Sequence, residues 1–366
     1  MREKVGYAAF AVVLIAVWGV GFLWVRGDLS FSADKAPAEK AGASASPSAS
    51  ADPTPSATPS TNAGKQLRGT IKAGQELRPV DINPAPARPR PIALPPVAQF
   101  TMATFNLLGS SHTRHSGKEP GKASGPQRLS GALQILDQHQ VTVVGLQEFQ
   151  TDQRRAFQSR AQGWAMYPGL TMRGGDGENS IAWRTSVWEM VKPATVAIPY
   201  FRGNARQMPS VLLRNKQTGV RAYFSNFHNP ADTAVFRNQG RFREAATARE
   251  IELFKAIAKT GVPQFVTGDM NMRDEYFCRV TGATGLIAAA GGSNRNGSCL
   301  VPRPTQIDWI FGSPGVQFKN YVIDRSPLVR RTTDHPVVVT SVTIDALKFA
   351  KSYDPTAPTG GAAVTP

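Results

Sequence analysis

Acidic, amide and histidine side chains recur in this sequence at the ends of short apolar runs. They are Asn106 in TFNLL, Glu148 in GLQEF, His228 in FSNFHNP, Asp269 and Asn271 in VTGDMNM, Asp308 in QIDWIF, and Asp334 and His335 in TTDHPVVV. Carboxylate and amide oxygens are ligands that hard divalent cations prefer, and histidine exchanges protons near neutral pH. Each segment alone is a weak signal, so the interpretation depends on the ordered set.

The apolar runs before these residues have the patterns of β-strands. Phe100–Leu107 (FTMATFNL) alternates between apolar and polar positions, whereas Val141–Leu146 (VTVVGL) and Pro263–Thr267 are continuous apolar runs typical of buried strands. Because strands are rigid, side chains at their ends can be aimed into one cleft.

The remaining pattern predicts many strands joined by short loops and only a few helices. Strands are expected at Gln306–Phe311, Phe318–Ile323 and Pro336–Val342, hairpins at Ser180–Trp183 with Val187–Val191 and at Ser210–Arg214 with Val220–Phe227, and helices at Pro126–Gln140 and Asn238–Lys259. This content favours two packed sheets covered by helices.

The N-terminus contains an uncharged apolar run from Val5 to Val25. A helix of about 20 such residues spans a bilayer, whereas the apolar region of a cleaved signal peptide is shorter, about 7–15 residues. We therefore expect residues 1–28 to be an uncleaved transmembrane signal anchor, with the rest of the chain outside the cytoplasm.

Composition divides the rest of the chain into three parts. Residues 29–65 are rich in Ala, Ser, Pro and Thr and have too few large apolar groups to offset the entropy of ordering, and residues 66–96 contain Pro and Arg and are expected to be extended. Together, residues 29–96 are predicted to be a disordered spacer. Residues 97–346 are expected to form the catalytic domain, and 347–366 a disordered tail.

The charge balance is strongly basic. The whole chain has a formal net charge of +16, and residues 97–346 contain 29 Lys and Arg against 18 Asp and Glu, a net of +11. A basic surface attracts polyanions such as nucleic acid or anionic lipid headgroups.

The chain has two cysteines, Cys278 and Cys299, which do not form a CxxC pair or a zinc-binding pattern. Because the domain is expected outside the cytoplasm, we predict that the two cysteines form one disulfide.

In order and spacing, the polar set resembles the endonuclease/exonuclease/phosphatase superfamily, which has a deoxyribonuclease-I-like fold. The resemblance covers about residues 98–343. It implies an α/β protein built as a four-layer α/β/β/α sandwich, and hydrolysis of a phosphoester at one edge of the two sheets.

The resemblance also implies a metal cofactor. Glu148 is the first expected ligand of Mg²⁺, with Asn106 beside it and Asp334 as a further ligand, and Mn²⁺ is expected to substitute. A metal ion there would stabilise charge and orient the phosphate.

Catalytic roles follow from the same resemblance. Asp269 is expected to hold the attacking water, and Asn271 to donate to a phosphoryl oxygen. His335 is expected to contact the scissile phosphate and Asp308 to orient it. His228 is a second expected donor.

The carboxylate partner of His228 is left open, because Glu178 and Asn179 both precede the strand SIAW and a shift of one residue exchanges them. His112 and Arg206 are candidate substrate-binding residues.

Three functions are compatible with the sequence. The first is a membrane-anchored nuclease with little sequence preference, whose partners are nucleic acid and the membrane, with no protein partner expected. The second is a phosphatase or phospholipase-type phosphodiesterase that acts on inositol phosphates or sphingomyelin-like lipids. The third is an inactive binding module, which the intact set of acids and histidines disfavours.

Overall fold

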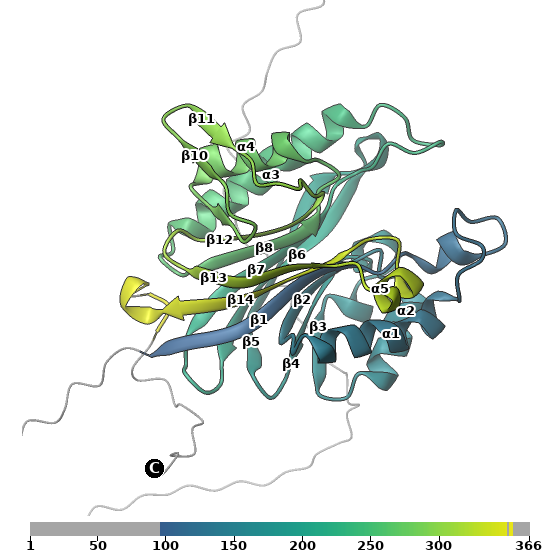
Figure 1. Ribbon diagram of the computed structural model, residues 1–366, viewed down its shortest axis with the longest axis horizontal. Helices are drawn as coiled ribbons and strands as arrows, with labels where there is room; N and C mark the ends of the chain where they lie inside the picture. The colour runs from purple at the N-terminus through teal and green to yellow at the C-terminus, as the bar shows by residue number, and fades with distance from the viewer. Residues whose placement is uncertain (1–95, 350, 354–366) are drawn as a thin grey trace, which may run out of the picture. The chain divides into compact units, whose positions relative to one another are not determined.

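A computed structural model describes residues 96–349 and 351–353, and in them two six-stranded mixed sheets pack face to face with helices on their outer sides (Figure 1). The predicted anchor and the spacer up to residue 95 lie outside the described residues. Within the described part of the chain, no helix has the length and apolar content needed to cross a membrane. The two packed sheets and the helices on their outer sides confirm the predicted α/β class.

The first sheet contains β1, the strand that ends in Asn106. Its order is β13 (Gln317–Asp324), β14 (Val337–Asp345), β1 (Val97–Asn106), β2 (Val143–Gln147), β4 (Ser180–Arg184) and β3 (Trp164–Tyr167). β1 runs parallel to β2 and antiparallel to β14.

The second sheet contains β7 and β8, which end in His228 and Asp269. Its order is β5 (Trp188–Pro199), β6 (Ala205–Asn215), β7 (Arg221–His228), β8 (Gln264–Asp269), β12 (Asp308–Gly312) and β9 (Ile287–Ala288). β7 runs parallel to β8, and β12 runs antiparallel to β8.

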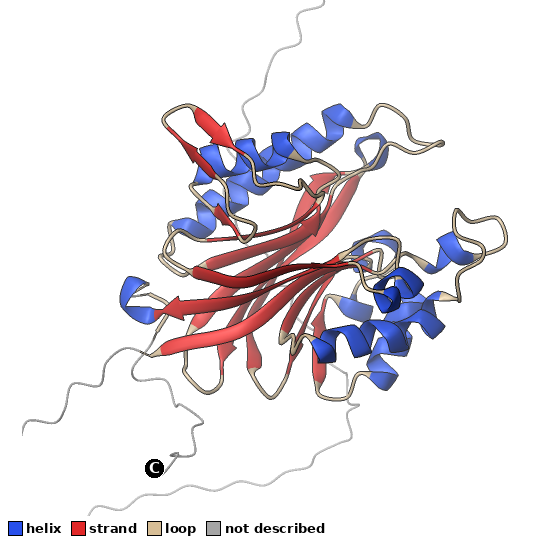
Figure 2. Ribbon diagram, viewed as in Figure 1, coloured by secondary structure: helices blue, strands red, loops and turns tan. Residues whose placement is uncertain are grey.

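In the described part of the chain, five α-helices cover the outer faces of the sheets (Figure 2). They are α1 (Gly125–Gln138), α2 (Thr151–Arg160), α3 (Gly240–Ala258), α4 (Asp274–Thr284) and α5 (Pro327–Thr332). The apolar side chains of α1, α2 and α5 share a core with the first sheet, and those of α3 and α4 share a core with the second. Helix, sheet, sheet and helix therefore follow one another as four layers.

A third core of large aromatic residues fills the space between the sheets. The ring of Phe100 lies 5.0 Å from that of Trp188 and 5.6 Å from that of Phe265, and all three side chains are buried. Burial of aromatic side chains of this size is the main stabilising contribution to such a core.

Toward the site, a buried polar network replaces this apolar contact. Gln147 Nε2 donates to Asn226 Oδ1 across the sheets at 2.6 Å, and Asn226 Nδ2 donates to the Leu146 carbonyl at 2.9 Å. Gly145 permits this close approach, because a Cβ atom there would lie 2.0 Å from Thr267 Oγ1. The network fixes the two sheets against each other beside the site residues.

One predicted hairpin is wrong. β4 and β5 do not pair with each other, since β4 lies between β2 and β3 in the first sheet and β5 pairs with β6 in the second. The chain crosses between the sheets after Arg184, and the buried Trp188 side chain enters the core between them. Alternation along the chain identifies strands but not the sheet to which each belongs.

The folded part also extends past the predicted boundary at residue 346. The side chains of Phe349 and Tyr353 pack against the core between the sheets, Ser352 is buried, and the Ser352 carbonyl accepts the Arg221 N–H at 2.7 Å. Of the predicted tail, residues 354–366 lie outside the described residues.

An additional hairpin, β10 (Ser293–Arg295) with β11 (Ser298–Leu300), lies beside α4. A disulfide joins Cys278 of α4 to Cys299 of β11, with 5.8 Å between their Cα atoms. The pair is the one expected from the sequence.

Candidate active site

The strand registers bring the polar strand ends to one edge of the two sheets. Asp269 pairs with His228 on the parallel strand β7 and with Asp308 on the antiparallel strand β12. In the first sheet, Asn106 pairs with Gln147, so that Glu148 follows directly at the end of β2.

Asn106 connects the two halves of this site. Its amide Nδ2 lies 3.1 Å from Glu148 Oε1 in the first sheet and 3.1 Å from Asp269 Oδ2 in the second. Two carboxylates thus converge on one fully buried amide. Glu148 offers carboxylate oxygens and Asn106 an amide oxygen, Oδ1, which accepts the Leu108 N–H at 3.0 Å. These are oxygen ligands of the kind that a hard divalent cation prefers.

Glu148 is held as an anion. Burial by itself would raise its pKa. The hydrogen bond with His112 and the hydrogen bond from the Gly109 N–H, which lies 2.8 Å from Oε2, outweigh the effect of burial and hold the pKa of Glu148 well below its usual range. His112 Nε2 lies 3.2 Å from the same oxygen. Glu148 also has a left-handed backbone with φ of 54°, an unfavourable conformation that tertiary contacts must maintain.

His335 is paired with a buried acid. Its Nδ1 lies 3.0 Å from Asp308 Oδ2, and its Nε2 lies 3.6 Å from Asp269 Oδ2. Burial would lower the pKa of His335, but the charge and hydrogen bond of Asp308, together with Asp269, raise it to about 10. His335 is therefore a cation at neutral pH.

The pKa of His228 is shifted in the opposite direction. Burial lowers its pKa, although the charge of Asp269, whose Oδ2 is 3.7 Å from His228 Nε2, opposes that effect. Burial and the neighbouring Asp308 raise the pKa of Asp269. The two histidines thus flank one carboxylate, and their pKa values are shifted in opposite directions, the pattern found where groups have distinct acid–base roles.

Neither candidate partner of His228 forms a hydrogen bond with it. Glu178 Oε2 instead accepts from Arg206 Nη1 at 3.4 Å, and Asn179 is fully buried with no hydrogen-bond partner for its amide among the described residues. The neighbour of His228 Nδ1 is Tyr200, with its hydroxyl at 3.5 Å.

Arg206 contacts residues next to the site. Its guanidinium group lies 3.9 Å from the centre of the Tyr200 ring as well as bonding Glu178. These contacts occupy a residue that the sequence suggested for substrate binding, and they position Tyr200 beside His228.

Asn271 lies at the site but is partly engaged. Its Nδ2 donates to the Asn229 carbonyl at 2.8 Å, its backbone N–H donates to Asp269 Oδ1 at 3.0 Å, and its φ is 49°. One amide hydrogen remains for another acceptor, since an amide carries two.

Asp334 is paired with a lysine. Lys118 Nζ lies 2.8 Å from Asp334 Oδ2. Burial would lower the pKa of Lys118, but Asp334 and Glu148 outweigh it and raise the pKa. Lys118 thus offsets part of the negative charge that Asp334 would offer to a metal ion.

A second set of atoms is close enough to hold a metal ion. One ligand atom each from Asp269, Asp308 and His335 lies within 4.8 Å of the others. In this group His335 Nδ1 is already paired with Asp308 Oδ2 at 3.0 Å. The pair formed by Glu148 and Asn106 is the better candidate.

The structure thus gathers the eight strand-end residues predicted from the sequence and adds His112 beside Glu148. Sequence reasoning missed Tyr200 and Lys118. The tyrosine directly follows the strand β5, as other site residues follow strands, and that position was its only signal. Lys118 lies in a loop whose sequence contains no signal that marks it as a site residue.

Comparison with known proteins gives one family. The model described as the Endonuclease/Exonuclease/phosphatase family matches residues 103–335. A search of curated proteins finds no match.

Solved structures share the fold at low sequence identity. An endonuclease/exonuclease/phosphatase family protein from Bacteroides thetaiotaomicron is 20% identical, with a TM-score of 0.53 over 68% of this chain and 96% of that one. The human Nocturnin catalytic domain with bound sulfate is 16% identical, with a TM-score of 0.52 over 68% and 99%. A mannosyl-6-phosphatase from B. thetaiotaomicron is 20% identical, with a TM-score of 0.52 over 66% and 99%.

Proposed function

The chain belongs to the endonuclease/exonuclease/phosphatase family, and from this membership and the geometry of the site we propose that it hydrolyses phosphodiester bonds with the help of a divalent metal ion. The observation that carries the proposal is the position of Asp269 between His335 and His228, with Oδ2 at 3.6 Å and 3.7 Å from their Nε2 atoms. This arrangement provides a proton acceptor between two imidazole groups whose pKa values are shifted in opposite directions.

The residues act as follows. Water attacks phosphorus while Asp269 accepts one of its protons, and the raised pKa of Asp269 makes it a better base than an exposed aspartate. His335 donates from Nε2 to a phosphoryl oxygen, and Asp308 keeps it charged and oriented. The bond from phosphorus to the leaving oxygen breaks with its electron pair on that oxygen, which takes up a proton from solvent, and Asp269 returns the proton that it accepted to solvent.

Glu148 and Asn106 would hold the metal ion, which we propose to be Mg²⁺ with Mn²⁺ able to replace it. The ion would stabilise charge on the phosphate as a Lewis acid. Asn271 has one amide hydrogen left to donate to the phosphate.

We propose nucleic acid as the substrate, cleaved with little sequence preference. The support is the net charge of +11 on residues 97–346, since phosphate contacts by basic residues carry no sequence information. A panel of supercoiled DNA, RNA, sphingomyelin and inositol phosphates, each with Mg²⁺ and with EDTA, tests the proposal. Turnover of a lipid or inositol phosphate with DNA and RNA intact would instead establish the phosphatase or phospholipase-type function.

We further propose that an N-terminal anchor holds the domain outside the cytoplasm. The support is the apolar run Val5–Val25, and a disulfide between Cys278 and Cys299 is typical of oxidising compartments. Protease added to intact cells should release a soluble domain that begins near residue 66. Protection of the domain until the cells are lysed would contradict this topology.

A further inference from the structure

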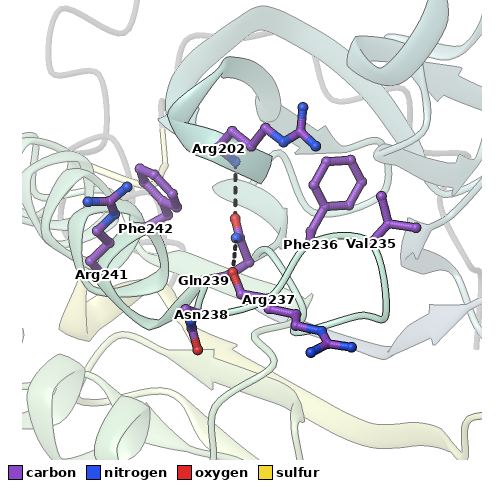
Figure 3. Close-up of a pocket in the computed structure, with 8 residues that line it drawn as sticks. All are labelled: Arg202, Val235, Phe236, Arg237, Asn238, Gln239, Arg241 and Phe242. Carbon is purple, nitrogen blue, oxygen red and sulfur yellow. Dashed lines mark hydrogen bonds between the residues drawn. The ribbon is translucent and has the colours of Figure 1, made fainter.

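A pocket of about 520 Å³ lies where the loop after β7 meets the start of α3. Its walls combine arginines with aromatic rings, namely Arg202, Arg237 and Arg241 with Phe236 and Phe242 (Figure 3). We propose that this pocket binds an unpaired nucleotide of a single-stranded nucleic acid whose scissile phosphate lies in the active site. The inference rests on the proposed function and narrows its substrate to single strands.

The pocket is built around one buried side chain. Gln239 is 4% exposed; its Oε1 accepts the Arg202 N–H at 3.0 Å and its Nε2 donates to the Arg237 carbonyl at 2.7 Å. Arg202 and Asn238 both have left-handed backbones, with φ of 59° and 58°. Such conformations persist where surrounding contacts fix them, so these two segments form a defined wall.

The rings and guanidinium groups alternate across the pocket. The Arg202 guanidinium lies 5.1 Å from the centre of the Phe236 ring, and that of Arg241 lies 4.6 Å from the centre of the Phe242 ring. Figure 3 shows Gln239 between these two ring–arginine pairs. Aromatic rings and guanidinium planes are the surfaces on which unpaired bases stack.

The positive charge of the pocket has no acidic partner in residues 96–349 and 351–353. The side chains of Arg202, Arg237 and Arg241 are exposed and form no ion pair there. Asp232, a nearby carboxylate, is already paired with Arg243 at 2.8 Å. The three arginines are therefore available for phosphate, with which guanidinium groups form paired hydrogen bonds.

A row of aromatic rings connects the pocket to the active site. The ring of Tyr200 lies 5.8 Å from that of His228 and 4.4 Å from that of Phe201, and Phe201 stacks on Phe236 at 4.3 Å with 7° between the ring planes. Tyr200 is 4% exposed, so the row is an internal connection, and three ring contacts separate Phe236 in the pocket wall from His228 in the active site. A strand with one phosphate beside His228 would reach the pocket over the surface above this row. Duplex bases are paired and stacked inside the helix, so only an unpaired base can enter.

The test is binding of a fluorescent oligothymidylate of about 12 nucleotides to the full chain in EDTA, compared with a duplex of the same length. Phe236→Ala should weaken binding of the single strand about 5- to 100-fold and change duplex binding less than about twofold. In Arg237→Ala, the slope of log affinity against log salt should fall by about 0.7, the value for one phosphate contact to a single strand.

Arg295→Ala is the matched control, because it removes the same charge from an exposed position on the β10–β11 hairpin, which lies away from this loop (Figure 1). It should bind both oligonucleotides as the unaltered chain does. Hydrolysis of bis(p-nitrophenyl) phosphate, which has no base, should be unchanged in Arg295→Ala and lost in His335→Ala.

The two proposals can fail separately. If bis(p-nitrophenyl) phosphate is hydrolysed but both pocket variants bind the single strand within about twofold of the unaltered chain, the pocket proposal is wrong and the hydrolase proposal stands. If no phosphodiester is hydrolysed but single-strand binding depends on Phe236, the pocket proposal stands alone. Absence of single-strand binding by the unaltered chain overturns the pocket proposal.

Discussion

His335 and Asp308 meet from different sheets, with 3.0 Å between Nδ1 of the histidine and Oδ2 of the aspartate. His335 precedes β14 of the first sheet, and Asp308 begins β12 of the second. The pair therefore depends on how the sheets pack, and it keeps the imidazole charged next to Asp269.

We expect both members of this pair to be required for catalysis. His335→Ala and Asp308→Asn should each lower kcat by about 10²–10⁴-fold, because they remove a charged donor or its orienting partner. His139→Ala is the control, since His139 forms a similar pair with Asp324 at 2.9 Å elsewhere in the fold. If kcat falls equally in His139→Ala and His335→Ala, the effect arises from impaired folding and not from loss of a catalytic group.

Glu148 should determine metal affinity. EDTA should abolish activity and Mg²⁺ or Mn²⁺ should restore it, and binding of the ion should raise the Tm of the unaltered chain because it stabilises only the folded state. Glu148→Gln should lose the rise in Tm, and Glu275→Gln, an exposed position on α4, should retain it. A full metal-dependent rise in Glu148→Gln would place the ion elsewhere.

Tyr200 should act only by positioning His228. Its hydroxyl is 3.5 Å from Nδ1, a long contact, so Tyr200→Phe should lower kcat less than about 10-fold, against about 10²–10⁴-fold for His228→Ala. Tyr223→Phe on β7 serves as the control. A loss in Tyr200→Phe as large as that in His228→Ala would make the hydroxyl a catalytic group.

Glu250 should make stability depend on pH. This fully buried residue of α3 accepts the Tyr276 hydroxyl at 2.6 Å, and burial outweighs that bond and raises its pKa to about 7. The folded state holds the proton more tightly than the unfolded state, so stability is complete below pH 4.5 and falls as pH rises to about 7. The loss is about 3 kcal/mol.

Glu250→Gln should remove this dependence, because the amide has a similar shape and does not ionise. Urea denaturation across this pH range measures it, with the exposed Glu252→Gln on the same helix as control. If the urea midpoint falls equally with pH in Glu250→Gln and in the unaltered chain, another group is responsible.

The disulfide should stabilise the α4 region. It closes a loop between positions 21 residues apart, which corresponds to about 3 kcal/mol in the chain-entropy model. Cys278→Ser with Cys299→Ser should lower the free energy of unfolding by that amount. Addition of a reductant should destabilise the unaltered chain to the same level and leave the double variant unchanged. Two thiols titrated in the purified unaltered protein would contradict the pairing.

The sequence by itself determined the family, the two-sheet class and the strand-end residues. The strand-end residues follow from local patterns, because the alternation and burial of a strand depend on consecutive residues. The apolar run of β8 ends in Asp269, and the run of β2 ends just before Glu148. The family model that matches residues 103–335 confirms the resemblance.

The tertiary structure decided which groups meet. Asn106 bridges Glu148 and Asp269 from different sheets, Tyr200 rather than Glu178 faces His228, and β4 and β5 separate into different sheets. Each of these relationships joins residues distant in the chain or depends on sheet pairing, and strand alternation carries no information about either. Sequence periodicity records which side of a strand faces a core, whereas packing of the two sheets sets which side chains lie opposite one another.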